Sequence, residues 1–130
     1  MRKYAGDSWL MKNVLRFSAK FLFQYRVEGS GDSEIIRLCE ERIIVFTAKS
    51  ARAALVYAKK YGKKEEHSYK NSVGGMVYFE FVGVLDLLDL EGCGPEEVWY
   101  DITRRKLPKE RAANILPAEE DLNAIRNLNR

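Results

Sequence analysis

The stretch VLRFSAKFLFQYRVE, residues 14–28, alternates between an apolar row and a mostly polar row of side chains. The apolar row contains Phe17, Ala19, Phe21, Phe23, Tyr25 and Val27, and the other row contains Arg16, Ser18, Lys20, Leu22, Gln24 and Arg26. A period of two residues is typical of a strand, because successive side chains of a strand point to opposite faces. One apolar and one polar face predict an antiparallel sheet that is covered on one side.

Working outward, we expect a second strand over 36–48, ending in the β-branched run at 43–45 and forming a hairpin with the first. Ser50 is a suitable N-cap for a helix over about 51–61, and Gly62 is placed where a left-handed C-cap is needed. Residues 67–70 favour a short strand and 71–75 a turn. Residues 76–88 predict a central strand that is apolar on both faces, with Gly83 as a candidate bulge.

The last part of the chain favours one more strand over 97–103 and a short final helix that begins near Pro117. We therefore predict an α+β fold, with an antiparallel sheet of four to five strands, one helix packed on it and a short C-terminal helix. No internal repeat or linker is visible, so we expect a single domain over 1–130, with a core at about 14–104 and a C-terminal extension at 105–130.

The composition argues against several classes of protein: strong nucleic-acid binders, membrane-spanning proteins and disulfide-rich proteins. With 22 basic and 19 acidic residues the net charge is +3, which lacks the basic excess of strong nucleic-acid binders. The apolar stretches are too short and too charged to cross a membrane, and Met1 to Asn13 lacks a signal-peptide pattern. We expect a cytoplasmic protein without membrane contact. Two cysteines, Cys39 and Cys93, are too few for a disulfide framework and are interpreted as small buried residues.

Four segments carry a resemblance to a known family. They are RFSAK at 16–20, EERIIVFTAKS at 40–50, YFEFVGVLDL at 78–87 and EVWY at 97–100. Together they resemble the bacterial domain of unknown function 4288 family, over roughly 14–104, and EFVGVLDL is the most specific piece. The resemblance implies a small bacterial α+β protein with no established activity, and it leaves the segment after Arg104 outside.

Glu80 interrupts the apolar central strand and is the most unusual polar residue of the chain. Asp86 has the same parity but lies six residues away, roughly 20 Å along a strand. Two carboxylates that share acid–base catalysis lie roughly 5–10 Å apart, so we expect no direct pair. We expect Glu80 to pair with a basic residue of a neighbouring strand, with Lys20 or Arg42 as candidates. A ligand contact and catalysis are the alternatives.

The remaining motifs give no specific chemistry. His67 is the only histidine and is expected to be an exposed surface residue, and no zinc-ligand spacing or phosphate-binding loop is present. We predict no catalytic residue, no metal and no cofactor. Candidate binding residues are the aromatic and basic side chains Trp99, Tyr100, Arg104, Arg105, Lys106 and Arg111, together with Glu80. For the aromatic pair, a place in the core is the favoured interpretation and a binding surface is the alternative.

These observations favour a protein-binding module over an enzyme. Open sheet edges and aromatic faces bind another protein or a second copy of the same chain, which suggests an immunity-like or regulatory partner. The sheet edge and the segment 104–111 are the expected surfaces. A nucleic-acid-associated protein that uses Trp99, Tyr100, Arg104 and Arg105 is the first alternative. An enzyme of unknown reaction centred on Glu80, with His67, is the second.

Overall fold

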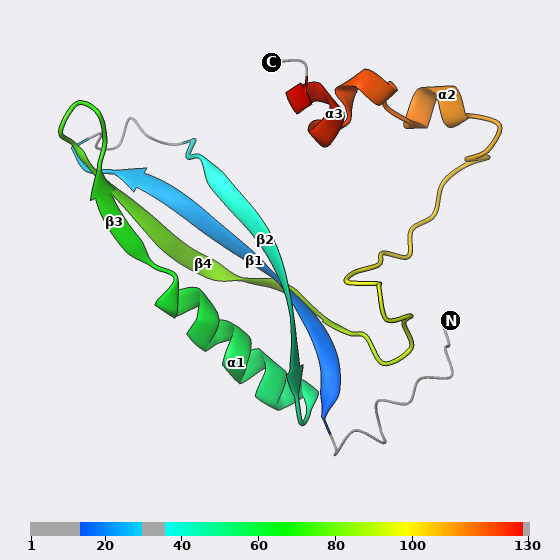
Figure 1. The fold of residues 1–130 in the computed structure, drawn as a ribbon, viewed down its shortest axis with the longest axis horizontal. Coiled ribbons are helices and arrows are strands. Elements are labelled where there is room, and N and C mark those ends of the chain that lie inside the picture. The colour runs from blue at the N-terminus through cyan, green and yellow to red at the C-terminus, as the bar shows by residue number, and fades with distance from the viewer. Residues whose placement is uncertain (1–13, 30–35, 129–130) are drawn as a thin grey trace. The chain divides into compact units, whose positions relative to one another are not determined.

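The computed structural model describes residues 14–29 and 36–128, and it shows the predicted α+β fold. Its elements are β1 (Leu15–Val27), β2 (Cys39–Ala48), α1 (Ala51–Lys64), β3 (His67–Lys70), β4 (Met76–Asp89), α2 (Ala112–Ile115), the 3-10 turn η3 (Glu119–Asp121) and α3 (Asn123–Leu128) (Figure 1). The chain divides into two compact units, Met1–Tyr100 and Asp101–Arg130. The N-terminal stretch Met1 to Asn13 and most of the connection between the two strands of the predicted first hairpin lie outside the described residues.

The sheet has four antiparallel strands, which agrees with the four to five predicted, and their order is β2-β1-β4-β3. β1 pairs with β2 in one unbroken register, from Leu15 opposite Ala48 to Gln24 opposite Cys39. The hairpin between β3 and β4 turns at Asn71, whose side-chain oxygen accepts hydrogen bonds from the backbone N–H groups of Val73 and Gly75. The long strands β1 and β4 therefore form the middle of the sheet.

The inner face of the sheet, on which α1 packs, holds the core. The alternation in β1 is confirmed, because Phe17, Ala19, Phe21 and Phe23 are all buried. Ala58 of α1 joins this cluster together with Phe79, and partly buried side chains pack around it: Tyr25, Ile44, Phe46, Tyr61, Phe81, Val84 and Leu87. Small residues on the helix allow the aromatic rings of the sheet to approach its backbone closely.

The start of α1 follows the prediction and its end does not. The Ser50 hydroxyl accepts a hydrogen bond from the backbone N–H of Ala53 at 3.1 Å, which confirms the N-cap. The predicted C-cap at Gly62 is wrong, because the helix continues to Lys64 and ends at Glu65. Gly62 is buried inside the helix, facing Phe81. Its lack of a side chain serves close packing rather than a left-handed turn.

β4 contains two irregularities that the sequence only partly indicates. Its register against β1 shifts between Lys20 and Phe21 and again between Leu22 and Phe23, so that Leu85 and Val82 are left without direct partners. Each shift inserts one extra residue and reverses which side chains face inward. The inward row therefore changes from Phe79 and Phe81 to Val84 and Leu87, so the inward side chains do not follow one alternation along the whole of β4.

The strand predicted at 97–103 is also wrong, because none of these residues joins a ladder. The Arg16 guanidinium donates hydrogen bonds to the carbonyl oxygens of Gly94, Pro95 and Glu97, at 2.9–3.1 Å. Through these hydrogen bonds, the irregular segment that follows β4 is attached to β1. Among the described residues, no strand forms a ladder with the short alternation at 97–103, and a lone strand is not stable.

Two smaller differences concern the strand and helix boundaries. β2 begins at Cys39 rather than 36, and the single final helix predicted near Pro117 is divided into α2, η3 and α3. No helix in the described part of the chain is long and apolar enough to cross a membrane. Cys39 is exposed and Cys93 is half-buried, which corrects their interpretation as buried residues.

Candidate functional site

The outer face of the sheet lies opposite α1, and it carries the even-numbered residues of β1. Among the described residues of the first unit, no helix packs on this face. The register places Gln24 directly opposite Glu80 of β4, and Arg26 opposite Tyr78. Because side chains of one parity share a face, these polar groups gather at one end of the outer face.

Glu80 is the centre of a polar cluster, which we call the Glu80 cluster: Gln24, Arg26, Glu28, Arg37, Tyr78 and Glu80. Arg26 binds both carboxylate oxygens of Glu80, at 3.0 and 2.9 Å, and Gln24 donates from its amide at 2.9 Å. Arg37 donates to the Gln24 side-chain oxygen at 3.2 Å. A bidentate arginine fixes the orientation of a carboxylate more strictly than a single donor does.

Tyr78 extends the Glu80 cluster. The Arg26 guanidinium lies 4.6 Å from the centre of the Tyr78 ring, and the Tyr78 hydroxyl donates to Glu28 at 2.9 Å. The hydrogen bonds from Arg26 and Gln24 lower the pKa of Glu80 below its ordinary value of 4.5, and the hydrogen bond to Glu28 raises the pKa of Tyr78. Glu80 therefore stays ionised near neutral pH, in a form suited to binding rather than to general-acid catalysis.

The predicted partners of Glu80 are wrong in identity, although pairing with a neighbouring strand is confirmed. Lys20 instead lies 3.5 Å from Glu41, and the Arg42 side chain joins the inner side of the sheet. There Arg42 binds Glu40 and Glu65, both at 2.6 Å, and lies 4.8 Å from the centre of the Phe23 ring. The Arg42 side chain lies on the inner face of the sheet and the Glu80 side chain on the outer face, so the two cannot form a pair.

Next to the Glu80 cluster lies an apolar surface, the outer patch, formed by Leu22, Val82 and Leu85. Val82 and Leu85 are the two extra residues of β4, and they are 55% and 48% exposed. Leu22 is half-buried opposite Gly83, and it precedes Gln24 by two residues on the same face of β1. The bulges thus present two aliphatic side chains to solvent beside an ordered polar group.

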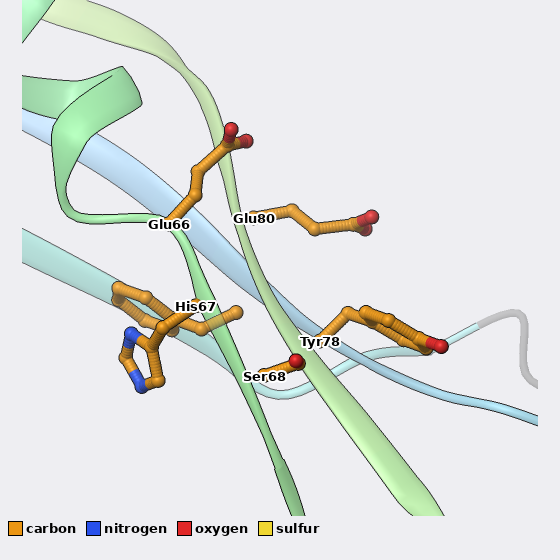
Figure 2. A pocket seen from close by; sticks show the side chains of 6 residues that line it. Glu66, His67, Ser68, Tyr78 and Glu80 are labelled. Atoms are coloured by element: carbon orange, nitrogen blue, oxygen red, sulfur yellow. The ribbon is translucent and has the colours of Figure 1, made fainter.

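The described residues also form an open cleft of about 270 Å³ along β3, lined by Glu66, His67, Ser68, Tyr78, Phe79 and Glu80. His67 pairs opposite Phe79, so its ring lies on the inner side, whereas Glu80 points to the outer side (Figure 2). His67 is exposed as predicted. Its Nδ1 lies 3.0 Å from the Glu65 carbonyl oxygen, so Nδ1 carries the proton of the neutral ring. The structure does not bring His67 and Glu80 together as a catalytic pair.

A comparison with known protein families identifies the family of this chain. The model of a family described as a domain of unknown function, DUF4288, matches residues 16–94. The chain belongs to the DUF4288 family. No curated protein and no solved structure matches it.

The matched DUF4288 region contains the sheet except for its first residue, Leu15, together with α1, the Glu80 cluster and the outer patch. Trp99 and Tyr100 lie beyond the matched region, are half-buried and belong to the first unit. The basic residues predicted with them are exposed and belong to the second unit: Arg104, Arg105, Lys106 and Arg111. The predicted aromatic and basic surface therefore spans two separate units, outside the part of the chain shared with the family.

Sequence reasoning selected Glu80 but missed the residues that hold it. Arg26 lies diagonally from Glu80, two residues beyond the direct partner Gln24, and only the register reveals this. The outer patch was also missed, because the sequence predicts an apolar strand on both faces, and Leu85 faces outward only after the shifts in register. In the described part of the DUF4288 chain, no three side chains of His, Cys, Asp or Glu are grouped to hold a metal ion.

Proposed function

We propose that this DUF4288 protein is a protein-binding module that recognises its partner with the outer face of the sheet. One observation carries the proposal: the outer patch and the Glu80 cluster lie next to each other on that face. The outer patch supplies exposed aliphatic side chains, and the Glu80 cluster beside it supplies charged and aromatic groups in fixed positions. An apolar centre with a polar border is the usual composition of a protein interface.

The order within the Glu80 cluster supports recognition of a specific partner. Arg26 and Glu80 are each partly exposed, with 41% and 30% of their side chains accessible, so both can form further contacts. Their mutual bonds hold the side chains in place before a partner arrives. Pre-ordered side chains lose less conformational entropy on binding than free ones do.

The proposal includes the biological setting inferred from the sequence. We place the protein in the bacterial cytoplasm, on the family resemblance and the composition. We include a role as an immunity-like or regulatory partner, because a small domain with an ordered polar cluster and a balanced surface charge is suited to binding one protein.

The test compares two matched valine substitutions. Val82 belongs to the outer patch, and Val56 lies on α1 with a similar exposure of 48%. The tagged full-length chain and the variants Val82→Lys and Val56→Lys are expressed in the native host and washed at moderate salt. Bound protein is identified by mass spectrometry and titrated against each purified variant. We expect a stoichiometric partner that loses roughly tenfold or more in affinity with Val82→Lys only.

A partner that binds both variants equally would place the interface elsewhere and refute the proposal. Bound nucleic acid that leaves as salt increases would instead support the alternative based on the basic segment. A wild-type chain that retains no protein at all would also contradict the proposal. Melting temperatures of both variants control for loss of folding.

A further inference from the structure

The outer edge of β2 is a second surface, distinct from the outer patch. β2 is the last strand in the order β2-β1-β4-β3, and its ten residues pair with β1 on one side. Among the described residues, no strand pairs with its other side. A long, regular edge strand without proline or a bulge is a template for another strand.

The direction of the free backbone groups follows from one hydrogen bond. The backbone N–H of Tyr25 donates to the carbonyl oxygen of Leu38 at 2.9 Å, one position before the first β2 pair. Hydrogen-bonded pairs alternate along an antiparallel ladder, so the even-numbered residues of β2 direct their backbone groups to β1. The odd-numbered residues direct theirs to the open edge, and these are Cys39, Glu41, Ile43, Val45 and Thr47.

The side chains of the same odd-numbered residues lie on the outer face. Ile43 and Val45 are each 41% exposed, and Glu41 is exposed at one end. Lys49 is exposed immediately after the strand. The edge therefore has a β-branched centre with a negative residue before it and a positive residue after it. In an antiparallel second copy the positive residue comes first and the negative residue last, so opposite charges can face each other.

Charge selects among the ways in which two copies can pair about a two-fold axis. An axis at Glu41 or at Arg42 would place two like charges directly opposite each other, which is unfavourable. An axis at Ile43 would place Arg37 opposite Lys49 of the second copy, which are again like charges, and an axis at Ile44 places no charge opposite another. An axis at Val45 places Glu41 opposite Lys49 of the second copy at both ends. It also places Ile43 opposite Thr47, and the two Val45 residues opposite each other.

We propose that a second copy of this chain pairs with β2 in antiparallel orientation, centred on Val45. In this register the free backbone groups of both edges meet, because every odd-numbered residue faces another odd-numbered residue. The two opposite-charge pairs and the apolar centre are complementary by symmetry. The two sheets become one, and both outer patches lie on the same side of it. This inference does not depend on the outer patch binding a partner.

Sedimentation equilibrium of the full chain over a wide concentration range tests the proposal. We expect the wild type to dimerise. Val45→Lys places two positive charges at the axis and should weaken dimerisation roughly tenfold or more. Val82→Lys is the matched control on the same face and should leave dimerisation unchanged. Circular dichroism and melting temperature show whether each variant folds.

A charge exchange tests the register without placing a charge at the apolar centre. Glu41→Lys and Lys49→Glu should each weaken the dimer, and the double variant should restore it. Glu41→Lys also loses the ion pair with Lys20, but the double variant loses it too, so their comparison isolates the contact between copies. The difference in dimer affinity between the single variants and the double variant should become smaller as the salt concentration increases.

Three results would overturn the proposal. The first is a wild-type chain that stays monomeric at every concentration, which would leave the β2 edge to a strand of a different protein. The second is a dimer that Val45→Lys leaves intact. The third is a double charge exchange that fails to restore a dimer weakened by the single changes. The outer-patch variants keep this outcome separate from the proposed function, because Val82→Lys should affect partner binding and not dimerisation.

Discussion

Gly62 of α1 lies directly against the aromatic ring of Phe81. A Cβ atom added to Gly62 would overlap three carbon atoms of that ring. Phe81 has little space to withdraw, because its ring lies 6.1 Å from the ring of Phe21 and 5.7 Å from that of Phe23, centre to centre. The last turns of the helix can approach the sheet this closely only because residue 62 has no side chain.

Gly62→Ala should therefore destabilise the protein, although alanine favours a helix by about 1 kcal/mol over glycine. We expect a net loss of about 1–3 kcal/mol in the free energy of unfolding, as is typical of overpacking. Urea denaturation measures this value. Gly83→Ala is the control, because an added Cβ at Gly83 has no atom within 4 Å. Equal stability of Gly62→Ala and wild type would show that the helix can shift away from Phe81.

Gly62 also shows why local sequence signals can identify an element and misplace its end. Ser50 was a correct N-cap because capping depends on groups within one turn of the helix. A glycine near the end of a helix has two explanations, a left-handed turn or a close contact with another element. Only the position of Phe81, nineteen residues later in the chain, distinguishes them. Long-range packing was not readable from the local pattern.

Arg42 connects β2 to the end of α1, and its replacement should loosen that connection. One guanidinium binds Glu40 and Glu65 and donates to the Tyr61 hydroxyl at 3.1 Å. The hydrogen bonds, led by that with Glu40, raise the pKa of Arg42, which keeps it charged. Arg42→Met leaves two carboxylates without this partner and should cost about 1–3 kcal/mol in unfolding free energy.

Hydrogen exchange supplies a local measurement of the same prediction. Amide protection in the last turn of α1 should fall in Arg42→Met more than in the first turn. Arg52→Met is the control, because Arg52 is exposed on the same helix, and its replacement should change stability by less than about 0.5 kcal/mol. Uniform loss of protection along α1 would argue that Arg42 stabilises the whole fold rather than the helix end.

Glu80 gives a prediction about pH, because the hydrogen bonds from Arg26 and Gln24 lower its pKa in the folded protein. Near neutral pH the carboxylate is ionised in both states and its stabilising contribution is complete. As pH falls below about 4.5 the unfolded chain takes up this proton first, so stability decreases until the folded pKa is passed. The wild type should therefore lose more stability on acidification than Glu80→Gln.

A double-mutant cycle with Arg26→Met and Glu80→Gln isolates this effect from other carboxylates. The coupling free energy should be favourable near neutral pH and should disappear in acid. A coupling that stays constant over the whole pH range would show that the packing of Arg26 on Tyr78, rather than the charge of Glu80, connects the two residues.

The surroundings of Glu80 show which features of the sheet the two-residue period of a strand predicts and which it does not. The alternation in β1 correctly identified its core row, because β1 itself contains no extra residue, although Ser18 of the other row is buried as well. β4 has two, at Val82 and Leu85, and both are aliphatic residues that an apolar strand would also contain. Gly83 was a visible signal for irregularity, but it indicated neither the number of bulges nor the resulting register. The partner of Glu80 and the outward direction of Leu85 depended on that register.

Arg16 gives the last prediction, because its side chain joins β1 to the segment after β4. Its guanidinium donates to three backbone carbonyl oxygens, at Gly94, Pro95 and Glu97. Arg16→Met removes all three donors, while the Arg16 backbone N–H can still donate to Glu91. We expect the sheet to persist and cleavage by chymotrypsin after Trp99 or Tyr100 to become faster, since proteolysis follows local opening. Mass spectrometry of the fragments identifies the site, and Arg16→Lys should show an intermediate rate because one donor group replaces a planar fork. If the rate at these aromatic residues stays equal to that of the wild type, other contacts of the segment hold it in place and Arg16 is dispensable.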